Sequence, residues 1–324
     1  MSSGNKKLLS VIIKAGILIM AAIFIYHKLN NNNNLLQFNQ LLNELSVVKV
    51  YTVLSSVLVL MLVNWVLEAF KWKFLVRQIQ KINTRKAIES VFCGLTLAIF
   101  TPNRIGEYGG RVFFLSPRKR IPGAIAMGVG AVGQMVVTNV LGSLAVLWFA
   151  GNFLELSYWL YYAWFFLTMV FCLLFLFFYF NIRWLGNILN SITFFKRFQR
   201  FFFVLSRYKK KSLIKVFMYS LARYAVFTSQ YCLIIHLLLP EMDLFPMIMM
   251  IFILFFIQSA LPSLDLLDVG VRSMTATYFF SFITDQDVAI MASTACIWFV
   301  NLIIPAILGA GFVFKLNIFG TNTN

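Results

Sequence analysis

The sequence predicts an all-α polytopic membrane protein with six full spans plus two re-entrant helical hairpins, arranged as an inverted-topology repeat. Three observations predict this fold class. The 324 residues are 60% hydrophobic and 12% charged, and the mean hydropathy is +0.83, whereas soluble domains are far more polar. Lys and Arg gather in short loops between long apolar runs, a pattern that orients membrane proteins. Finally, two apolar runs are interrupted by proline, glycine and charged residues.

The first half of the chain is predicted to contain three spans and one hairpin. The spans Leu8–Tyr26 and Val47–Phe70 are separated by a polar loop with the asparagine run Asn30–Asn34. We interpret the first span as a retained anchor helix and the asparagine run as a flexible loop. Basic residues flank the broken segment Glu89–Leu115 on both sides, so both of its ends are expected to face the cytoplasm. Ile121–Phe149 then crosses outward.

The second half repeats this order in the opposite orientation. Tyr158–Phe180 leads to a long basic loop, in which phenylalanines between residues 194 and 203 predict a helix on the membrane surface. Lys215–Leu239 crosses outward, the broken segment Leu244–Phe282 has acidic flanks and enters from outside, and Val288–Phe314 returns. We therefore expect one transmembrane domain, 1–324, with inverted halves at approximately 1–150 and 157–315 and both termini cytoplasmic.

The two broken segments share a proline followed by the pattern acid-x-Gly-x-Arg. The pairs Glu107/Arg111 and Asp268/Arg272 are each four residues apart, which places acid and arginine on one helix face. Charge at membrane depth is costly and is a functional hypothesis by default. Broken, charged segments in corresponding places of two halves also point to the binding site of a transporter. The structural alternative is that each pair only neutralises itself to permit insertion.

The candidate site residues follow from these segments. Arginine outnumbers acid within the apolar sequence, and guanidinium groups suit bidentate contact with phosphate, so an anionic headgroup is favoured. Glu68 is interpreted as an interfacial ion pair rather than a substrate ligand. The helix breaks are assigned to Pro102, Gly106, Gly109, Gly110, Pro262 and Gly270, although glycine can also serve only in packing. The candidate substrate-binding residues are Arg104, Glu107, Arg111, Arg223, Asp265, Asp268 and Arg272.

Other functional classes have little support in the sequence. The net charge of +17 does not indicate a nucleic-acid partner, because the basic residues lie in loops between spans. We expect no metal site, since His27 and His236 are the two histidines and the four cysteines lack the spacing of ligands. We also expect no cofactor and no enzymatic activity, because no nucleotide-binding or nucleophile motif is visible.

The first broken segment also resembles a known family. Pro102-Asn103-Arg104-Ile105-Gly106-Glu107, followed by Arg111, is similar to the Pro-x-Arg-x-Gly-Glu segment of the lysylphosphatidylglycerol synthase transmembrane region, a flippase-like membrane family. Gly270-Val271-Arg272 resembles the Gly-x-Arg end of its second segment, and the resemblance covers nearly the whole chain. It implies a membrane domain that moves lipids, such as aminoacylated phosphatidylglycerol, between leaflets. Related domains are attached to synthases or glycosyltransferases.

The chain differs from this family pattern in three respects. It lacks a soluble aminoacyl-transferase domain, so it is not expected to make an aminoacyl lipid itself. The second motif contains Asp265 and Asp268 where the family is richer in glycine. Gln134 and Met135 stand where many members have an acid–arginine pair, so the identity of the substrate is not transferred.

We therefore predict a flippase or transporter for an anionic, phosphate-bearing lipid of the bacterial inner (cytoplasmic) membrane. The expected partners are membrane lipids and, as a protein, a synthase or a glycosyltransferase. One alternative is a small-solute or ion transporter, which a cavity closed to lipid would favour. Another is a non-catalytic membrane accessory subunit of a system for envelope lipid or glycan synthesis, which co-purification with a synthase would favour.

Overall fold

A computed structural model describes residues 32–99, 101, 104–182, 184, 205, 207–261 and 268–313. Throughout these ranges the regular elements are helices and there are no strands, which confirms the predicted all-α membrane fold. The predicted span Leu8–Tyr26, the predicted surface helix around residues 194–203 and both chain ends lie outside the described residues.

Five helical segments are long and apolar enough to cross a membrane, judged by length and composition. They correspond to the five predicted spans that the described residues include. These segments are α3 (Val47–Val76), α6 (Arg120–Phe153), α7 (Tyr158–Phe180), α10 (Lys210–Leu238), and the continuous run of α13 (Asp287–Trp298), the π-helical η4 (Phe299–Ile303) and α14 (Ile304–Val313).

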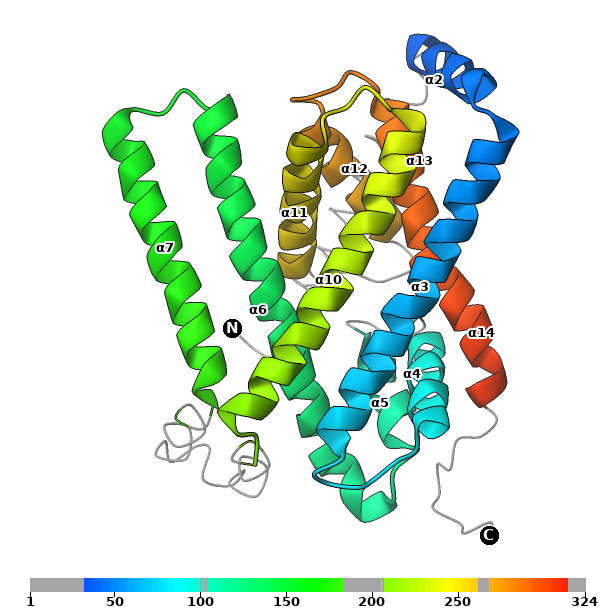
Figure 1. Ribbon diagram of the computed structural model, residues 1–324, viewed down its shortest axis with the longest axis vertical. Helices are drawn as coiled ribbons and strands as arrows, with labels where there is room; N and C mark the ends of the chain where they lie inside the picture. The colour runs from blue at the N-terminus through cyan, green and yellow to red at the C-terminus, as the bar shows by residue number, and fades with distance from the viewer. Residues whose placement is uncertain are drawn as a thin grey trace, which may run out of the picture.

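Each broken segment forms a pair of short helices. The first consists of α4 (Thr84–Ile99) and α5 (Ile105–Val112), and the second of α11 (Leu244–Ala260) and α12 (Asp268–Phe280). Each of these helices has fewer residues than the roughly 20 needed to span the hydrocarbon core. The two helices of each pair pack on each other, and the pairs lie near opposite ends of the bundle (Figure 1).

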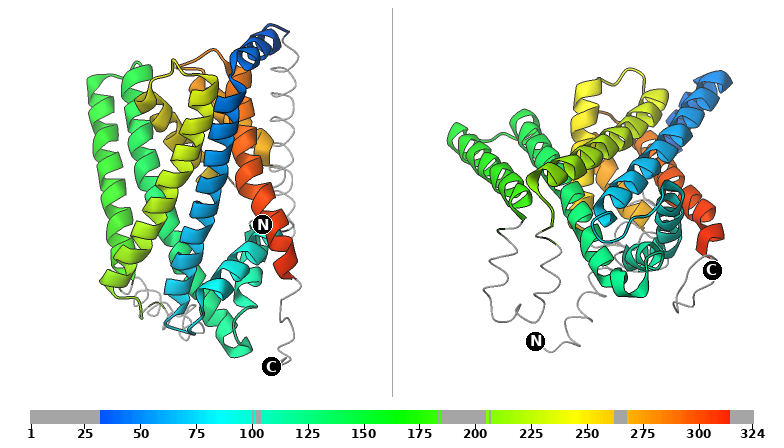
Figure 2. Two further views of the ribbon diagram at one scale, coloured as in Figure 1. Left: turned by 45° about the vertical axis from the view of Figure 1, so that its right-hand side comes forward. Right: turned by 60° about the horizontal axis from the view of Figure 1, so that its bottom comes forward.

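The two short-helix pairs contact the long helices reciprocally. In the centre, α3 packs against α10. The helix α4 packs against α14, at the end of the second half, and α11 packs against α6, at the end of the first half. The outermost helix, α7, lies at the edge of the bundle against α6 (Figures 1 and 2). The division into two inverted halves stays a prediction, and these contacts are the main observation that bears on it.

A close backbone contact joins α4 to α14. The Thr96 hydroxyl donates a hydrogen bond of 2.7 Å to the carbonyl oxygen of Ala306. A Cβ added at Gly309 would lie 2.1 Å from the carbonyl oxygen of Phe92. Gly142 of α6 and Gly309 stand at equivalent positions. Each is the same number of residues from the start of its helical segment, which begins with α6 for Gly142 and with α13 for Gly309. Gly142 faces Phe256 of α11, so both reciprocal contacts depend on a glycine.

Gly309→Ala should destabilise the protein by about 1–3 kcal/mol, because backbone atoms of α4 leave no room for a methyl group. The matched control is Gly128→Ala on α6, where no atom lies within 4 Å of the added Cβ. This control should be neutral or slightly stabilising, since alanine favours a helix. Thermal unfolding in detergent measures both, and equal melting temperatures for the two variants would contradict the contact.

Three details of the sequence interpretation are wrong. The loop expected to include the asparagine run is in part the helix α2 (Asn32–Glu44), which packs on α13. The span predicted to end at Phe70 continues as α3 to Val76 and includes the buried Lys71. The described glycines assigned to the helix breaks lie inside helices: Gly106, Gly109 and Gly110 in α5, and Gly270 in α12.

These glycines lie inside helices because they serve the packing of one helix on another. A Cβ at Gly110 would lie 2.5 Å from the Cα of Gly94, so glycine permits α4 and α5 to approach closely rather than breaking either helix. The first break itself lies between Ile99 and Ile105. Pro102 and Pro262, the prolines assigned to the two breaks, lie outside the described residues.

Candidate functional site

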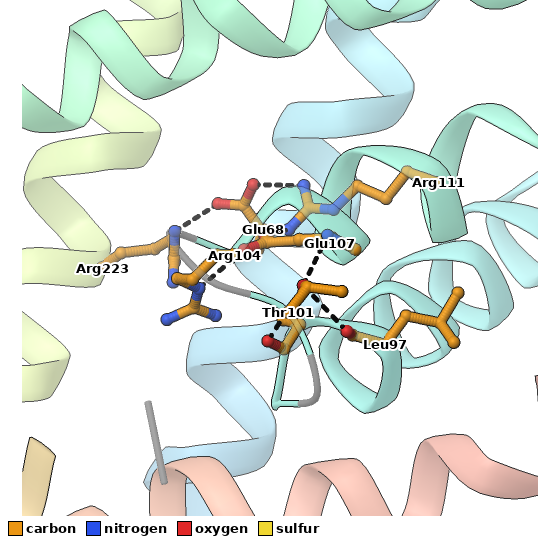
Figure 3. A network of polar contacts seen from close by, with 9 residues as sticks. Glu68, Leu97, Thr101, Arg104, Glu107, Arg111 and Arg223 are labelled. Atoms are coloured by element: carbon orange, nitrogen blue, oxygen red, sulfur yellow. Dashed lines mark hydrogen bonds and ion pairs between the residues drawn. The ribbon is translucent and has the colours of Figure 1, made fainter. Parts of the chain in front are cut away.

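A strained residue stands directly before the short helix α5. Arg104 precedes it with φ of 56° and ψ of 27°, the left-handed region that non-glycine residues rarely occupy. Its Nε donates to Oε2 of Glu107 at 2.9 Å, which fixes the side chain over the first turn of α5. Thr101 joins the two helices: its hydroxyl accepts a 2.7 Å hydrogen bond from the amide of Gly106 and donates to the carbonyl oxygen of Leu97 at 3.1 Å (Figure 3).

Glu68 on α3 lies at the centre of a buried ion-pair network. It accepts from Nη1 of Arg111 at 2.6 Å and from Lys71 at 2.7 Å, and it also pairs with Arg223 of α10. Figure 3 shows Arg223 and Arg111 approaching the two oxygens of this carboxylate from opposite sides. One acid thus connects a helix of the first short pair to both central spans.

Arg111 and Glu107 extend the same network. They form the ion pair that their spacing of four residues predicts, and Arg111 is only 2% exposed. Arg111 therefore bridges two carboxylates, one on its own helix and one on α3. We call the six residues Lys71, Glu68, Arg104, Glu107, Arg111 and Arg223 the carboxylate network.

Arg223 is held by three neighbours on α3. Besides its pairing with Glu68, its Nε donates to Oδ1 of Asn64 at 2.9 Å. Its Cζ lies 5.2 Å from the centre of the Trp65 ring, a cation–π distance. These contacts orient a guanidinium group at the α3–α10 interface, where long apolar helices surround it.

Two adjoining cavities lie beside these groups. The arginine cavity, of about 280 Å³, is bordered by Arg104, Arg223 and Arg272 together with residues of α3, α6, α11 and the segment from Ile297 to Leu302. The network cavity, of about 390 Å³, is bordered by the carboxylate network. Arg104, Arg223, Gln134 and Ser259 belong to both walls, so the cavities adjoin.

The structure thus places the predicted site residues in two groups. Arg104, Arg223 and Arg272 border one cavity, although they come from the residue before α5, from α10 and from α12. Arg111 and Glu107 lie in the network cavity instead. Nη1 of Arg272 donates to Oε1 of Gln258 at 2.9 Å. Asp265 lies outside the described residues, and of Asp268 the structure describes the backbone at the start of α12.

Sequence reasoning missed the central position of Glu68. An ion pair was expected for Glu68, and it pairs with Lys71, but its contacts with Arg111 and Arg223 were not expected. The available signal was the spacing of Asn64, Glu68 and Lys71, which places three polar groups on one face of an otherwise apolar helix. Within the described residues, no cluster of three or more His, Cys, Asp or Glu could hold a metal ion. The expected absence of cofactors and of enzymatic activity stays a prediction.

The comparisons with known proteins agree with this architecture. The family model described as lysylphosphatidylglycerol synthase TM region matches residues 11–309. Searches of curated proteins and of solved structures found no match. The family match includes every helix from α3 to α13 and all three arginines of the arginine cavity. The chain is therefore an integral membrane protein that belongs to the lysylphosphatidylglycerol synthase transmembrane region family.

Proposed function

We propose that this protein moves an anionic lipid with a phosphate-bearing headgroup between the leaflets of the bacterial inner membrane, with both termini in the cytoplasm. The observation that carries the proposal is the arginine cavity, where guanidinium groups from three separate segments of the chain border one space inside a membrane domain. Arginine presents N–H donors in a planar fork that matches phosphate oxygens. A volume of about 280 Å³ suits a headgroup rather than a whole lipid.

The acyl chains need a path that leaves them in the bilayer. Along the same side of α6, Ala131 and Met135 border the network cavity and are exposed, and Met135 is 46% exposed. Ser259, near the end of α11, is exposed and borders both cavities. The two cavities thus extend to surface residues of membrane-embedded helices, which supports a lipid over a solute that must be enclosed.

Alternating exposure of the headgroup is proposed to come from two inverted halves. The reciprocal contacts of α4 with α14 and of α11 with α6 support this division. Inverted halves let one bundle rock against the other around a fixed central site. In one state the α4–α5 pair would separate from the cavity toward the cytoplasm, and in the other the α11–α12 pair would separate toward the outside.

The test is transbilayer movement of tail-labelled phosphatidylglycerol in liposomes, read with a quencher that cannot cross the membrane. Liposomes with the protein should expose inner-leaflet lipid faster than protein-free liposomes. Met135→Trp should slow this movement severalfold, because a large ring would narrow the exposed side of the network cavity. Leu167→Trp on the exposed face of α7 is the matched control and should leave the rate unchanged. Rates equal to those of protein-free liposomes for every anionic lipid would overturn the proposal.

A further inference from the structure

The buried core of the carboxylate network contains more positive than negative charge. Arg104 lies at its edge, with 36% of its side chain exposed. The other five residues are mostly buried, and they are the cations Lys71, Arg111 and Arg223 and the acids Glu68 and Glu107. Three cations thus share two carboxylates. An uncompensated buried charge is costly, so this core favours either a bound anion or the loss of a proton.

Lys71 is the cation of this core that can release a proton. A guanidinium group stays protonated in proteins, whereas a buried lysine can become a neutral amine. Lys71 is 2% exposed and pairs at 2.7 Å with Glu68. That carboxylate also pairs with Arg111 and Arg223. With Lys71 neutral, two guanidinium groups face two carboxylates and the core is balanced, whereas protonation of either acid would increase the excess of positive charge.

Lys71 borders the network cavity, and the helices around it contribute a defined set of groups. The charged or titratable residues that border this cavity with Lys71 are Glu68 of the same helix, Arg104 before α5, Glu107, Tyr108 and Arg111 of α5, and Arg223 of α10. The residues of α6 in the described wall are uncharged, and the charged residues of α4 do not border the cavity. A volume of about 390 Å³ is large enough to hold water, which can carry a proton to and from Lys71.

Arg223 connects the charge of this core to the arginine cavity. It borders both cavities and pairs with Glu68, as Figure 3 shows. An anion bound at Arg223 would share the guanidinium group with Glu68 and weaken that ion pair. Glu68 would then depend more on a charged Lys71 for compensation. Binding of an anion therefore favours binding of a proton, and by linkage a proton favours the anion.

We infer that Lys71 takes up a proton when an anionic headgroup binds at Arg223, so that the protein moves the anion and the proton across the membrane together. The neutral amine of Lys71 accepts the proton from water in the network cavity on the side where the headgroup enters. The ammonium group returns the proton to water on the side where the headgroup leaves. The inference rests on the proposed function for the movement of a lipid, whereas proton-linked binding of the anion can be measured without movement.

The first test measures proton uptake on binding. Short-chain phosphatidylglycerol, whose phosphodiester stays ionised, is added to the protein in detergent, in weakly buffered, mildly alkaline solution with a pH indicator. The wild-type protein should take up about one proton for each bound lipid. Lys71→Arg should bind the lipid without proton uptake, because its charge cannot change. Lys71→Met should also take up no proton and should bind more weakly, because the positive excess is gone.

The matched control is Lys73→Met, two residues further along α3. The ammonium group of Lys73 donates to the hydroxyl of Thr84 at 2.7 Å, outside both cavities, so this variant should keep the wild-type proton uptake. Wild-type protein that binds the lipid without proton uptake would overturn the inference, as would uptake retained by Lys71→Arg. The measurement on the wild-type protein decides the inference if neither variant of Lys71 folds.

The second test uses liposomes with an alkaline interior and tail-labelled phosphatidylglycerol in the outer leaflet. The wild-type protein should concentrate the lipid in the inner leaflet beyond the level of protein-free liposomes, and a protonophore should remove this asymmetry. Lipid movement that gives the same final distribution with and without the pH gradient would overturn proton coupling and leave the proposed function standing. Proton uptake on binding without any lipid movement would sustain the proton-linked anion site and overturn lipid movement as the function.

Discussion

Glu68→Gln should be the most destabilising single substitution in the carboxylate network. The carboxylate accepts from Arg111 and Lys71 and pairs with Arg223, and all three cations come from membrane-embedded helices. Removing one partner of a buried ion pair leaves uncompensated charge and costs about 3–5 kcal/mol. Thermal unfolding in detergent, followed by size-exclusion chromatography, should show a strongly lowered melting temperature and little monodisperse protein.

Two further variants make this result specific. Glu155→Gln removes an exposed acid in the loop after α6 and should change stability by no more than about 0.5 kcal/mol. Glu68→Gln combined with Lys71→Met removes a buried cation along with the acid, and should recover part of the loss. A melting temperature of Glu68→Gln equal to that of the wild type would contradict the central position of Glu68.

Arg272→Gln should abolish most lipid movement while the protein stays folded. Arg272 borders the arginine cavity, where its Nη1 donates a hydrogen bond to Oε1 of Gln258. Losing a charge-assisted hydrogen bond to phosphate costs about 1.5–3 kcal/mol, which corresponds to a roughly 10–100-fold slower rate. The measurements are the liposome assay with phosphatidylglycerol and the melting temperature of the same preparation.

Arg111→Gln changes the corresponding arginine of the first broken segment, and its expected effect differs from that of Arg272→Gln. Because Arg111 bridges Glu68 and Glu107 and is buried, its removal should lower the melting temperature more than Arg272→Gln does. Arg85→Gln, in an exposed pair with Glu89 on α4, is the control and should affect neither measurement. If Arg272→Gln unfolds as readily as Arg111→Gln, Arg272 is structural and the arginine cavity loses its assigned role.

Much of the fold could be predicted because its signals are local. Hydropathy over about 20 residues locates the long helices, and proline, glycine and charge locate the two short-helix pairs. The ion pair of Glu107 and Arg111 follows from a spacing of four residues on one helix. Each of these features depends on neighbours in sequence rather than on tertiary contacts.

The rest depends on which helices meet. Glu68 is near the end of a span, where an acid beside Lys71 is typical of the membrane–water interface. The contacts of Glu68 with Arg223 and Arg111 form because α10 and α5 meet α3 in the folded protein. Asn301 is an unremarkable polar residue until the π-helical turn and the adjoining arginines are known. The site therefore needed tertiary structure, although most of its arginines were identified from sequence.

The most direct test of the phosphate site is native mass spectrometry of the lipids that remain bound after purification. The wild-type protein should retain a phosphodiester lipid, and the double variant Arg223→Gln/Arg272→Gln, purified in the same detergent, should lose it. Retention of the same lipids by both proteins, or of uncharged lipids alone by the wild type, would contradict a guanidinium cavity that binds a phosphate headgroup.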